Sequence, residues 1–226
     1  MDQPLSSVQS VVELTNDVVI ISGSNADGDG VVMRSLDKTK SWEKALTVPA
    51  PKEKKKQKIE LIKAPDPQPI YVSQLRVDPF NPEYVYAVTS TGNLLYGEQS
   101  GKTWNRLPYD KGSVIKMLPS PHREKEVFLL TTRGDLIRFF NEEQEKINPR
   151  HQRVNLLDFT LVEQFPDAII VGTNFGASAT SDGGQTWVDL RLPISTSTPI
   201  INSIVAISPT NPSRIFVAVH NIFYRS

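Results

Sequence analysis

The chain has 226 residues, of which 38% are apolar and 22% are charged, and it contains 12 glycines and 17 prolines. This composition is typical of an ordinary globular chain and excludes disordered, fibrous and membrane classes. No cysteine is present, so a disulfide scaffold, a thiolate metal site and a cysteine nucleophile are excluded. The 25 basic and 25 acidic residues balance, so the charge gives no reason to expect nucleic acid as a partner.

The apolar runs of the chain are short, and we expect no transmembrane segment. Residues 18–21 form one of the longest runs, far below the roughly 20 residues that a membrane-spanning helix needs. The first ten residues lack the basic and apolar regions of a secretory signal. The sequence therefore allows either a cytoplasmic protein or an exported protein whose signal has been removed.

Short runs of β-branched and aromatic residues separated by turn residues begin near Val11 and predict β-strands throughout. The first turn, residues 24–30, contains Asn25, Asp27 and Asp29, which copy the first half of a calcium-binding loop. Leu36 stands where the bidentate glutamate of such a loop belongs. We therefore expect a hairpin turn here, with calcium binding as the alternative.

An eight-residue pattern that ends in tryptophan follows, and we call it the tryptophan box, with positions one to eight. It occurs at residues 35–42, 97–104 and 180–187, and each of the three tryptophans of the chain closes one copy. Its characteristic residues are Ser35, Asp37, Ser41 and Trp42 in the first copy, Gln99, Gly101, Thr103 and Trp104 in the second, and Thr180, Asp182, Gly184, Thr186 and Trp187 in the third.

An insert at residues 49–69 separates the first two repeats and carries the strongest charge asymmetry of the chain. Between residues 52 and 63 it has six lysines against two glutamates. The lysines that could contact a partner are Lys52, Lys54, Lys55, Lys56 and Lys58. They form either a docking element for an acidic partner or a solvated loop bracketed by prolines.

The chain repeats with a period of about 42 residues, which decides the predicted fold. Residues 77–97 recur at the C-terminus, with Asn81 and Pro82 matching Asn211 and Pro212, and weaker copies lie between them. The repeat predicts five units of four strands. They begin near Val11, Tyr71, Ser113, Asn155 and Asn202. The fifth unit is incomplete, because Ser226 would open its box, and a charged hairpin at residues 141–153 replaces the box of the third.

The tryptophan box resembles the Asp-box, or bacterial neuraminidase repeat, [ST]-x-D-x-G-x-[TS]-W, and the resemblance covers nearly the whole chain. It implies an all-β fold, a β-propeller of four-stranded antiparallel blades, with residues 1–226 forming a single domain. It also implies that Asp37 and Asp182 fasten their own turns and have no catalytic or metal-binding role. Gln99 at the same position of the second copy supports that interpretation.

The strand entries at residues 81–86 and 211–216 resemble those of photosystem II assembly-factor-like and sortilin-like propellers. This resemblance implies a non-catalytic scaffold, exported or at the cell surface, that binds a protein or peptide. The alternative is a carbohydrate-binding or sialidase-like glycoside-hydrolysing propeller, but the early [FY]-R-I-P motif of sialidases is absent. We expect no cofactor, no metal and no nucleic acid, since His122, His151 and His220 lack the spacing of metal ligands.

Propellers of these families close larger rings than five blades. We therefore expect this chain to be part of a longer propeller, with self-association through open blade edges as the second alternative. A closed five-bladed ring is the third.

Overall fold

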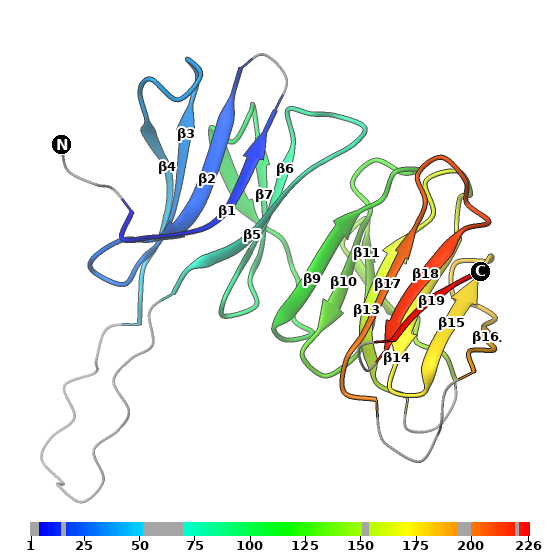
Figure 1. Ribbon diagram of the computed structural model, residues 1–226. Helices are drawn as coiled ribbons and strands as arrows, with labels where there is room; N and C mark the ends of the chain where they lie inside the picture. Colours follow the sequence, from blue (N-terminus) through cyan, green and yellow to red (C-terminus); the bar gives the residue numbers. More distant parts are fainter. Residues whose placement is uncertain (1–4, 15–16, 52–69, 151–153, 194–199, 220–221) are drawn as a thin grey trace, which may run out of the picture. The chain divides into compact units, whose positions relative to one another are not determined.

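The computed structural model describes residues 5–14, 17–51, 70–150, 154–193, 200–219 and 222–226. Within these ranges every regular element is a β-strand, and no helix is present that could cross a membrane. The strands pair as neighbours in sequence order, all antiparallel, in five separate sheets (Figure 1). This confirms the predicted all-β architecture of repeated blades.

Four sheets have four strands and the fifth has three. The first sheet contains β1 (Ser7–Glu13), β2 (Val19–Ser24), β3 (Gly30–Ser35) and β4 (Glu43–Val48). The second contains β5 (Val72–Val77), β6 (Val85–Thr89), β7 (Leu94–Glu98) and β8 (Thr103–Arg106). The third contains β9 (Val114–Pro119), β10 (Val127–Thr131), β11 (Leu136–Phe140) and β12 (Glu143–Lys146). The fourth contains β13 (Leu156–Leu161), β14 (Ile169–Thr173), β15 (Gly176–Thr180) and β16 (Val188–Leu190). The fifth contains β17 (Ser203–Ile207), β18 (Ile215–Val219) and β19 (Ile222–Arg225).

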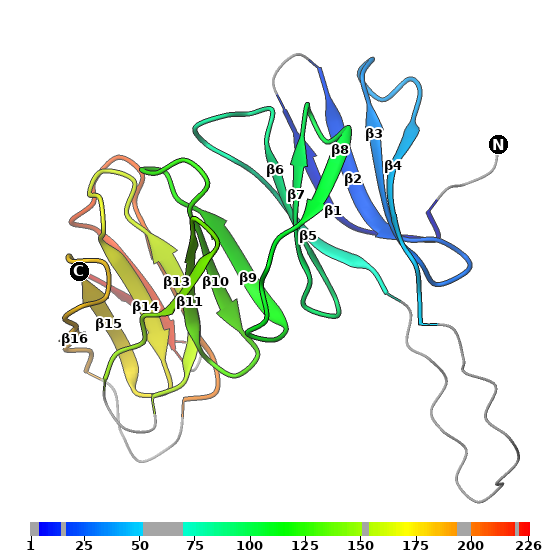
Figure 2. The ribbon, with the colours of Figure 1, turned by 180° about the vertical axis from the view of Figure 1, so that it is seen from behind.

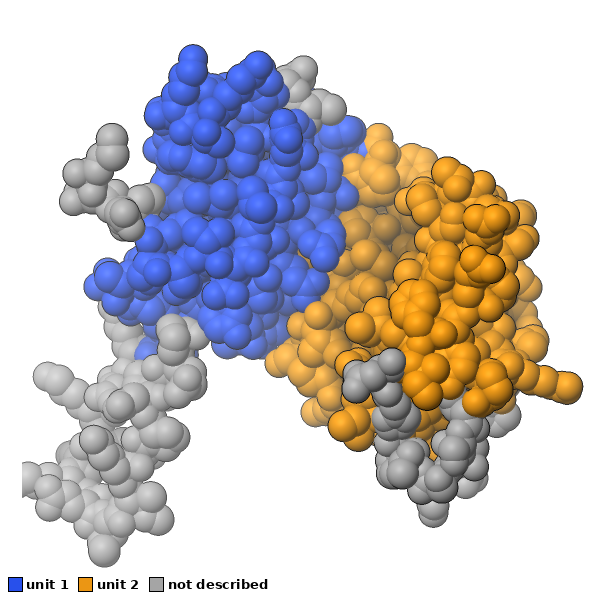
Figure 3. All heavy atoms as spheres, in the orientation of Figure 1, with its two compact units in different colours: residues 1–77, 81–108 blue, residues 78–80, 109–226 orange. Residues whose placement is uncertain are grey.

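The chain divides into two compact units, which are described separately (Figure 3). Unit 1 is formed by Met1–Val77 and Asn81–Pro108 and holds the first two sheets. Unit 2 is formed by Asp78–Phe80 and Tyr109–Ser226 and holds the other three, which can be followed from both sides in Figures 1 and 2.

Apolar packing between adjacent sheets forms the core of each unit. In unit 1 one cluster joins residues of the first and second sheets, and Trp104 packs against it. In unit 2 a cluster joins the third and fourth sheets, with Trp187 packed against it, and another joins the fourth and fifth sheets. None of the residues in the second and third strands of the four-stranded sheets is exposed.

The first strand of each four-stranded sheet contains a β-bulge near its start. The pairing skips one residue between Val8 and Ser10 in β1, between Val72 and Gln74 in β5, and equivalently in β9 and β13. A bulge twists the strand and redirects the next side chain. That next residue is polar in all four strands: Ser10, Gln74, Lys116 and Asp158.

The packing of box glycines against the preceding sheet gives a testable prediction. Gly184 has a φ of +94°, and an added Cβ would lie 2.8 Å from Cβ of Ile147. We expect Gly184→Ala to lower the free energy of unfolding by about 2 to 4 kcal/mol, since backbone strain and a steric clash add. Urea unfolding measures the change.

Gly112→Ala is the matched control for this substitution. Gly112 has a similar φ of +101°, but no atom lies within 4 Å of the added Cβ. It should therefore cost only the backbone strain, about 1 kcal/mol. Equal costs for the two variants would contradict the close contact with Ile147.

Candidate functional site

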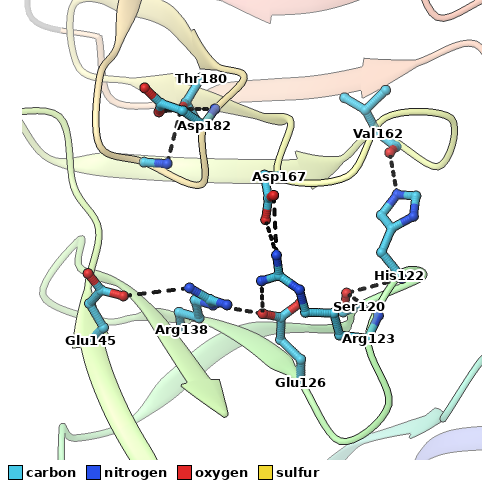
Figure 4. A network of polar contacts seen from close by, with 11 residues as sticks. Ser120, His122, Arg123, Glu126, Arg138, Glu145, Val162, Asp167, Thr180 and Asp182 are labelled. Carbon is cyan, nitrogen blue, oxygen red and sulfur yellow. Dashed lines mark hydrogen bonds and ion pairs between the residues drawn. The ribbon is translucent and has the colours of Figure 1, made fainter.

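The complete tryptophan box closes its turn with the Asp182 carboxylate. This group accepts hydrogen bonds from the backbone N–H of Thr186 at 2.9 Å and from the Thr186 hydroxyl at 2.5 Å. It also accepts from the Thr180 hydroxyl at 2.7 Å, and Asp182 and Thr180 are both labelled in Figure 4. The Trp187 indole Nε1 donates to the Gly184 carbonyl at 3.1 Å. All of these partners belong to the same eight residues.

The other two boxes have the same geometry in part. Asp37 accepts from the backbone N–H of Ser41 at 2.9 Å and from the hydroxyls of Ser41 and Ser35. In the second box Gln99 has a φ of +51°, and Trp104 Nε1 donates to the Gly101 carbonyl at 2.8 Å. Thr103 of the second box is the first residue of β8. Trp42 of the first box is 36% exposed.

The hydrogen bonds of the boxes lower the pKa of both aspartates to about 2. For Asp182 the Thr186 hydroxyl has the largest effect, followed by the Thr186 backbone N–H and the Thr180 hydroxyl. For Asp37 the Ser41 hydroxyl has the largest effect. A glycosidase acid needs a pKa raised toward neutrality, so these two carboxylates are displaced in the opposite direction.

The lowered pKa gives Asp182 a pH-dependent contribution to stability. Its folded-state pKa of about 2 lies below the usual aspartate value of 3.8, so the stabilisation is complete only above about pH 5 and is lost as the pH falls toward 2. We expect Asp182→Asn to lower the Tm at pH 7 and the difference from wild type to shrink between pH 4 and 2. Thermal unfolding at a series of pH values measures this.

Gln99→Asn is the control, because position three of the second box carries no carboxylate. Its effect on the Tm should not change with pH. A Tm difference for Asp182→Asn that stays constant down to pH 2 would contradict the role of the ionised group.

The calcium-like turn forms its own hydrogen bonds. The Asn25 side-chain carbonyl accepts from the backbone N–H groups of Asp27 at 3.0 Å and Asp29 at 2.8 Å. The Asp29 carboxylate accepts from the backbone N–H of Ala50 and from the Asn25 amide. Within the described ranges, no three His, Cys, Asp or Glu side chains gather as metal ligands would.

Several residues singled out from the sequence lie outside the described residues. These are Lys52, Lys54, Lys55, Lys56, Lys58, His151 and His220. His122 is described, and its Nε2 lies 3.1 Å from the Val162 carbonyl, a contact between loops of the third and fourth sheets.

Sequence reasoning missed a buried polar network between the third and fourth sheets of unit 2 (Figure 4). The Glu126 side chain is 3% exposed, and its Oε1 accepts from Arg138 at 2.7 Å and from Arg123 at 3.2 Å. Arg123 also contacts Asp167 at 2.9 Å, across the two sheets. Because both arginines are occupied in this way, the network serves to position the sheets.

A second missed contact lies on the first strands of unit 2. Lys116 Nζ contacts Asp158 at 2.6 Å, and the other carboxylate oxygen of Asp158 accepts from the Val205 N–H at 2.9 Å. In unit 1 the Ser10 hydroxyl accepts from the Leu75 N–H in the same manner. These contacts have a signal in the sequence: the residue that follows the bulge of the first strand is polar in all four sheets that have the bulge.

The Glu126 network gives a stability prediction with an internal control. We expect Glu126→Ala to cost about 3 kcal/mol or more, because it removes the buried carboxylate from two guanidinium groups. Glu145→Ala removes a carboxylate that is 66% exposed and 3.8 Å from the same Arg138, and it should cost less than about 1 kcal/mol. Urea unfolding of both variants compares them. Equal costs would contradict the importance of burial.

The fifth sheet of unit 2 has an edge unlike that of the other sheets. Its third strand, β19, has no further strand paired to it in the described part of the chain, and Ile222 and Phe223 are 55% and 70% exposed. The register places Ile204, Ala218 and Phe223 in one row on one face of the sheet, and Ile204 is 54% exposed. The edge and this face therefore present apolar side chains to solvent.

A cavity of about 360 Å³ lies beside this edge, between the fourth and fifth sheets. Its apolar lining includes Leu190, Leu192, Ile215, Val217 and Tyr224. Arg191, Pro193, Arg225 and Ser226 complete it. The apolar walls favour an apolar side chain as occupant, while the two arginines favour an acidic flank.

Comparison with known proteins establishes the fold. No protein-family model and no curated protein sequence matches the chain. Among solved structures, YCF48 bound to D1 peptide is similar with a TM-score of 0.56 and 16% identity, over 93% of this chain and 60% of that chain.

Two glycoside-hydrolase structures are also similar. The GH74 xyloglucanase from Xanthomonas campestris has a TM-score of 0.64 and 16% identity, over 96% of this chain and 36% of that chain. An ancestral GH74 enzyme has a TM-score of 0.62 and 14% identity, over 100% of this chain and 32% of that chain. The chain thus spans 60% of the first structure and about a third of the enzymes. Its fold is that of a β-propeller, with five blade units.

Proposed function

We propose that this protein is a non-catalytic interaction scaffold of the Asp-box propeller type, which binds a protein or peptide. The similarity in fold to YCF48, which was solved bound to a D1 peptide, carries the proposal, and the exposed strand β19 is the contact surface that the described residues offer. The equivalent third strands β3, β7, β11 and β15 are buried almost throughout, whereas β19 exposes three of its four residues.

Two of the four outer strands of the other sheets carry several charged residues. The strand β12 carries Glu143, Glu145 and Lys146, and β4 begins with Glu43 and Lys44. Such charges discourage pairing with another chain, whereas β8, β16 and β19 each have a single charged residue. An exposed apolar edge strand is a template for an added strand.

The register of β19 identifies the backbone groups available to a partner. The Ser226 N–H donates to the Ile215 carbonyl, so it points toward β18. Because N–H directions alternate along an antiparallel strand, the N–H groups of Phe223 and Arg225 point to the free side. A partner strand would take its main-chain hydrogen bonds from these two residues.

The neighbouring structures support both a peptide-binding and an enzymatic alternative. YCF48 was solved with a D1 peptide, while the GH74 proteins are named as enzymes, and one fold hosts many functions. Glycoside hydrolysis requires a pair of carboxyl groups. A second cavity, of about 270 Å³, is lined by a single acidic residue, Asp189, which accepts from the Ser178 hydroxyl at 2.7 Å. This cavity therefore lacks the pair of carboxyl groups, which supports the scaffold function.

The test is selection of binders from a phage-displayed library of random 12-residue peptides on the immobilised protein. Selected peptides should bind wild type and Arg225→Ala equally, because that control keeps the N–H. They should bind Arg225→Pro at least about tenfold more weakly, since proline removes an outward N–H. Fluorescence polarisation of labelled peptides measures the affinities.

Failure to select any peptide, or equal binding to Arg225→Pro, would contradict β19 as the site. Release of reducing sugar from xyloglucan, or of a fluorophore from a sialoside, would contradict the non-catalytic function.

A further inference from the structure

The third strand of the fourth sheet has small side chains where the other four-stranded sheets have large ones. The residue opposite the third position of the second strand is Ser178 in the fourth sheet. In the other three sheets this residue is large and apolar: Met33, Leu95 and Ile137. The adjacent position holds Ala177 in the fourth sheet, and in the others it holds Val32, Leu94 and Leu136. All of these side chains are buried, so the fourth sheet leaves space that the other sheets fill.

The second cavity, of about 270 Å³, lies at this place, because Ala177 and Ser178 both line it. Protein interiors are close-packed, and unfilled space costs stability. Phe175 also lines the cavity, from the turn between β14 and β15, and it is 58% exposed. An aromatic ring that is open to solvent therefore stands beside space that the chain itself does not fill.

The charge at the paired position of the outer strand is inverted as well. The residue of β16 that pairs with Ser178 is Asp189. The residues in this place in the other three sheets are all basic: Lys44, Arg106 and Lys146. The Asp189 carboxylate accepts from the Ser178 hydroxyl at 2.7 Å, and it is the single charged group among the described residues that line the cavity. The fourth sheet thus has an acidic wall where its relatives carry a base.

We propose that this cavity binds a basic side chain, best an arginine, of the partner polypeptide. The inference rests on the proposed function and specifies the chemistry of the partner. In the other three sheets the chain supplies its own lysine or arginine beside a large apolar residue. In the fourth sheet both residues differ: the serine leaves room, and Asp189 has the charge that complements a base.

An arginine side chain fits the described walls in three respects. Its aliphatic stem suits the apolar side chains of Val154 and Leu190. Its planar guanidinium can stack on the ring of Phe175. A carboxylate accepts several hydrogen bonds at once, so the bond from Ser178 is compatible with a guanidinium at Asp189.

The experiment titrates acetyl-arginine amide into the full chain and follows the backbone amide signals by NMR. Acetyl-citrulline amide, which has nearly the same shape without the charge, is the matched compound. We expect the arginine compound to shift the signals of Thr173, Phe175 and Asp189. It should bind at least about tenfold more tightly than the citrulline compound, because hydrogen bonds to a charged group are the stronger ones.

Variants of the protein test the walls of the cavity. Ser178→Leu introduces the residue that the second sheet has at this position, and by filling the cavity it should abolish binding of the arginine compound. Asp189→Asn keeps the shape and should weaken that binding at least about tenfold. Phe165→Ala is the matched control, because Phe165 is 55% exposed in the loop between β13 and β14 and does not line the cavity. Circular dichroism and the urea midpoint verify that each variant is folded.

The outcomes separate this inference from the proposed function. Equal affinity of the two compounds, or an affinity for the arginine compound that Asp189→Asn leaves unchanged, would contradict the basic side-chain site. Library peptides that still bind the protein would then leave the scaffold function standing. Binding of the arginine compound together with failure to select any library peptide would contradict a polypeptide partner. Failure of the arginine compound and the library alike would contradict both proposals.

Discussion

Apolar packing of one sheet against the next is the interaction on which the rest of this structure depends. A four-stranded sheet of five-residue strands cannot bury both of its faces alone, so each face needs a neighbour. The three clusters of the core all lie at such interfaces. On the fifth sheet, Ile204 and Phe223 leave apolar surface exposed. The proposed binding surface includes these exposed side chains.

Four carboxylates among the described residues serve the architecture. Asp37 and Asp182 close the turns of their boxes, and Glu126 and Asp158 join neighbouring sheets. A carboxylate held by several donors is poorly suited to exchange protons with a substrate. The fifth sheet differs from these polar sites, because it exposes apolar side chains and the backbone groups of its edge strand. Both features are suited to polypeptide recognition.

The repeat in the sequence predicted the architecture closely because strand positions depend on local patterns. Sheets two to five begin within one residue of the predicted positions, since β-branched runs between turn residues mark them. The first sheet begins at Ser7, before the predicted Val11, because Ser7, Gln9 and Ser10 interrupt the apolar pattern of β1. The three described strands of the fifth sheet also agree with the repeat, because the period places Ser226 at the first position of a box.

The polar contacts between sheets could not be predicted in the same way. Nothing in the pattern distinguishes the buried Glu126 from the exposed Glu124 or Glu145, because the arginine and backbone partners come from other strands. Asp158 depends on Lys116 and on the Val205 N–H, which lie far away in the sequence. The cavity likewise requires walls from two sheets, so only the assembled blades reveal it.

Amide hydrogen exchange of β19, measured by NMR on the isolated chain, tests the central claim most directly. If the edge is free, the amides of Phe223 and Arg225 exchange rapidly while those of Tyr224 and Ser226, which point toward β18, are protected. Protection of all four amides in a dilute monomer would mean that the edge is already paired within the chain, and it would contradict the account.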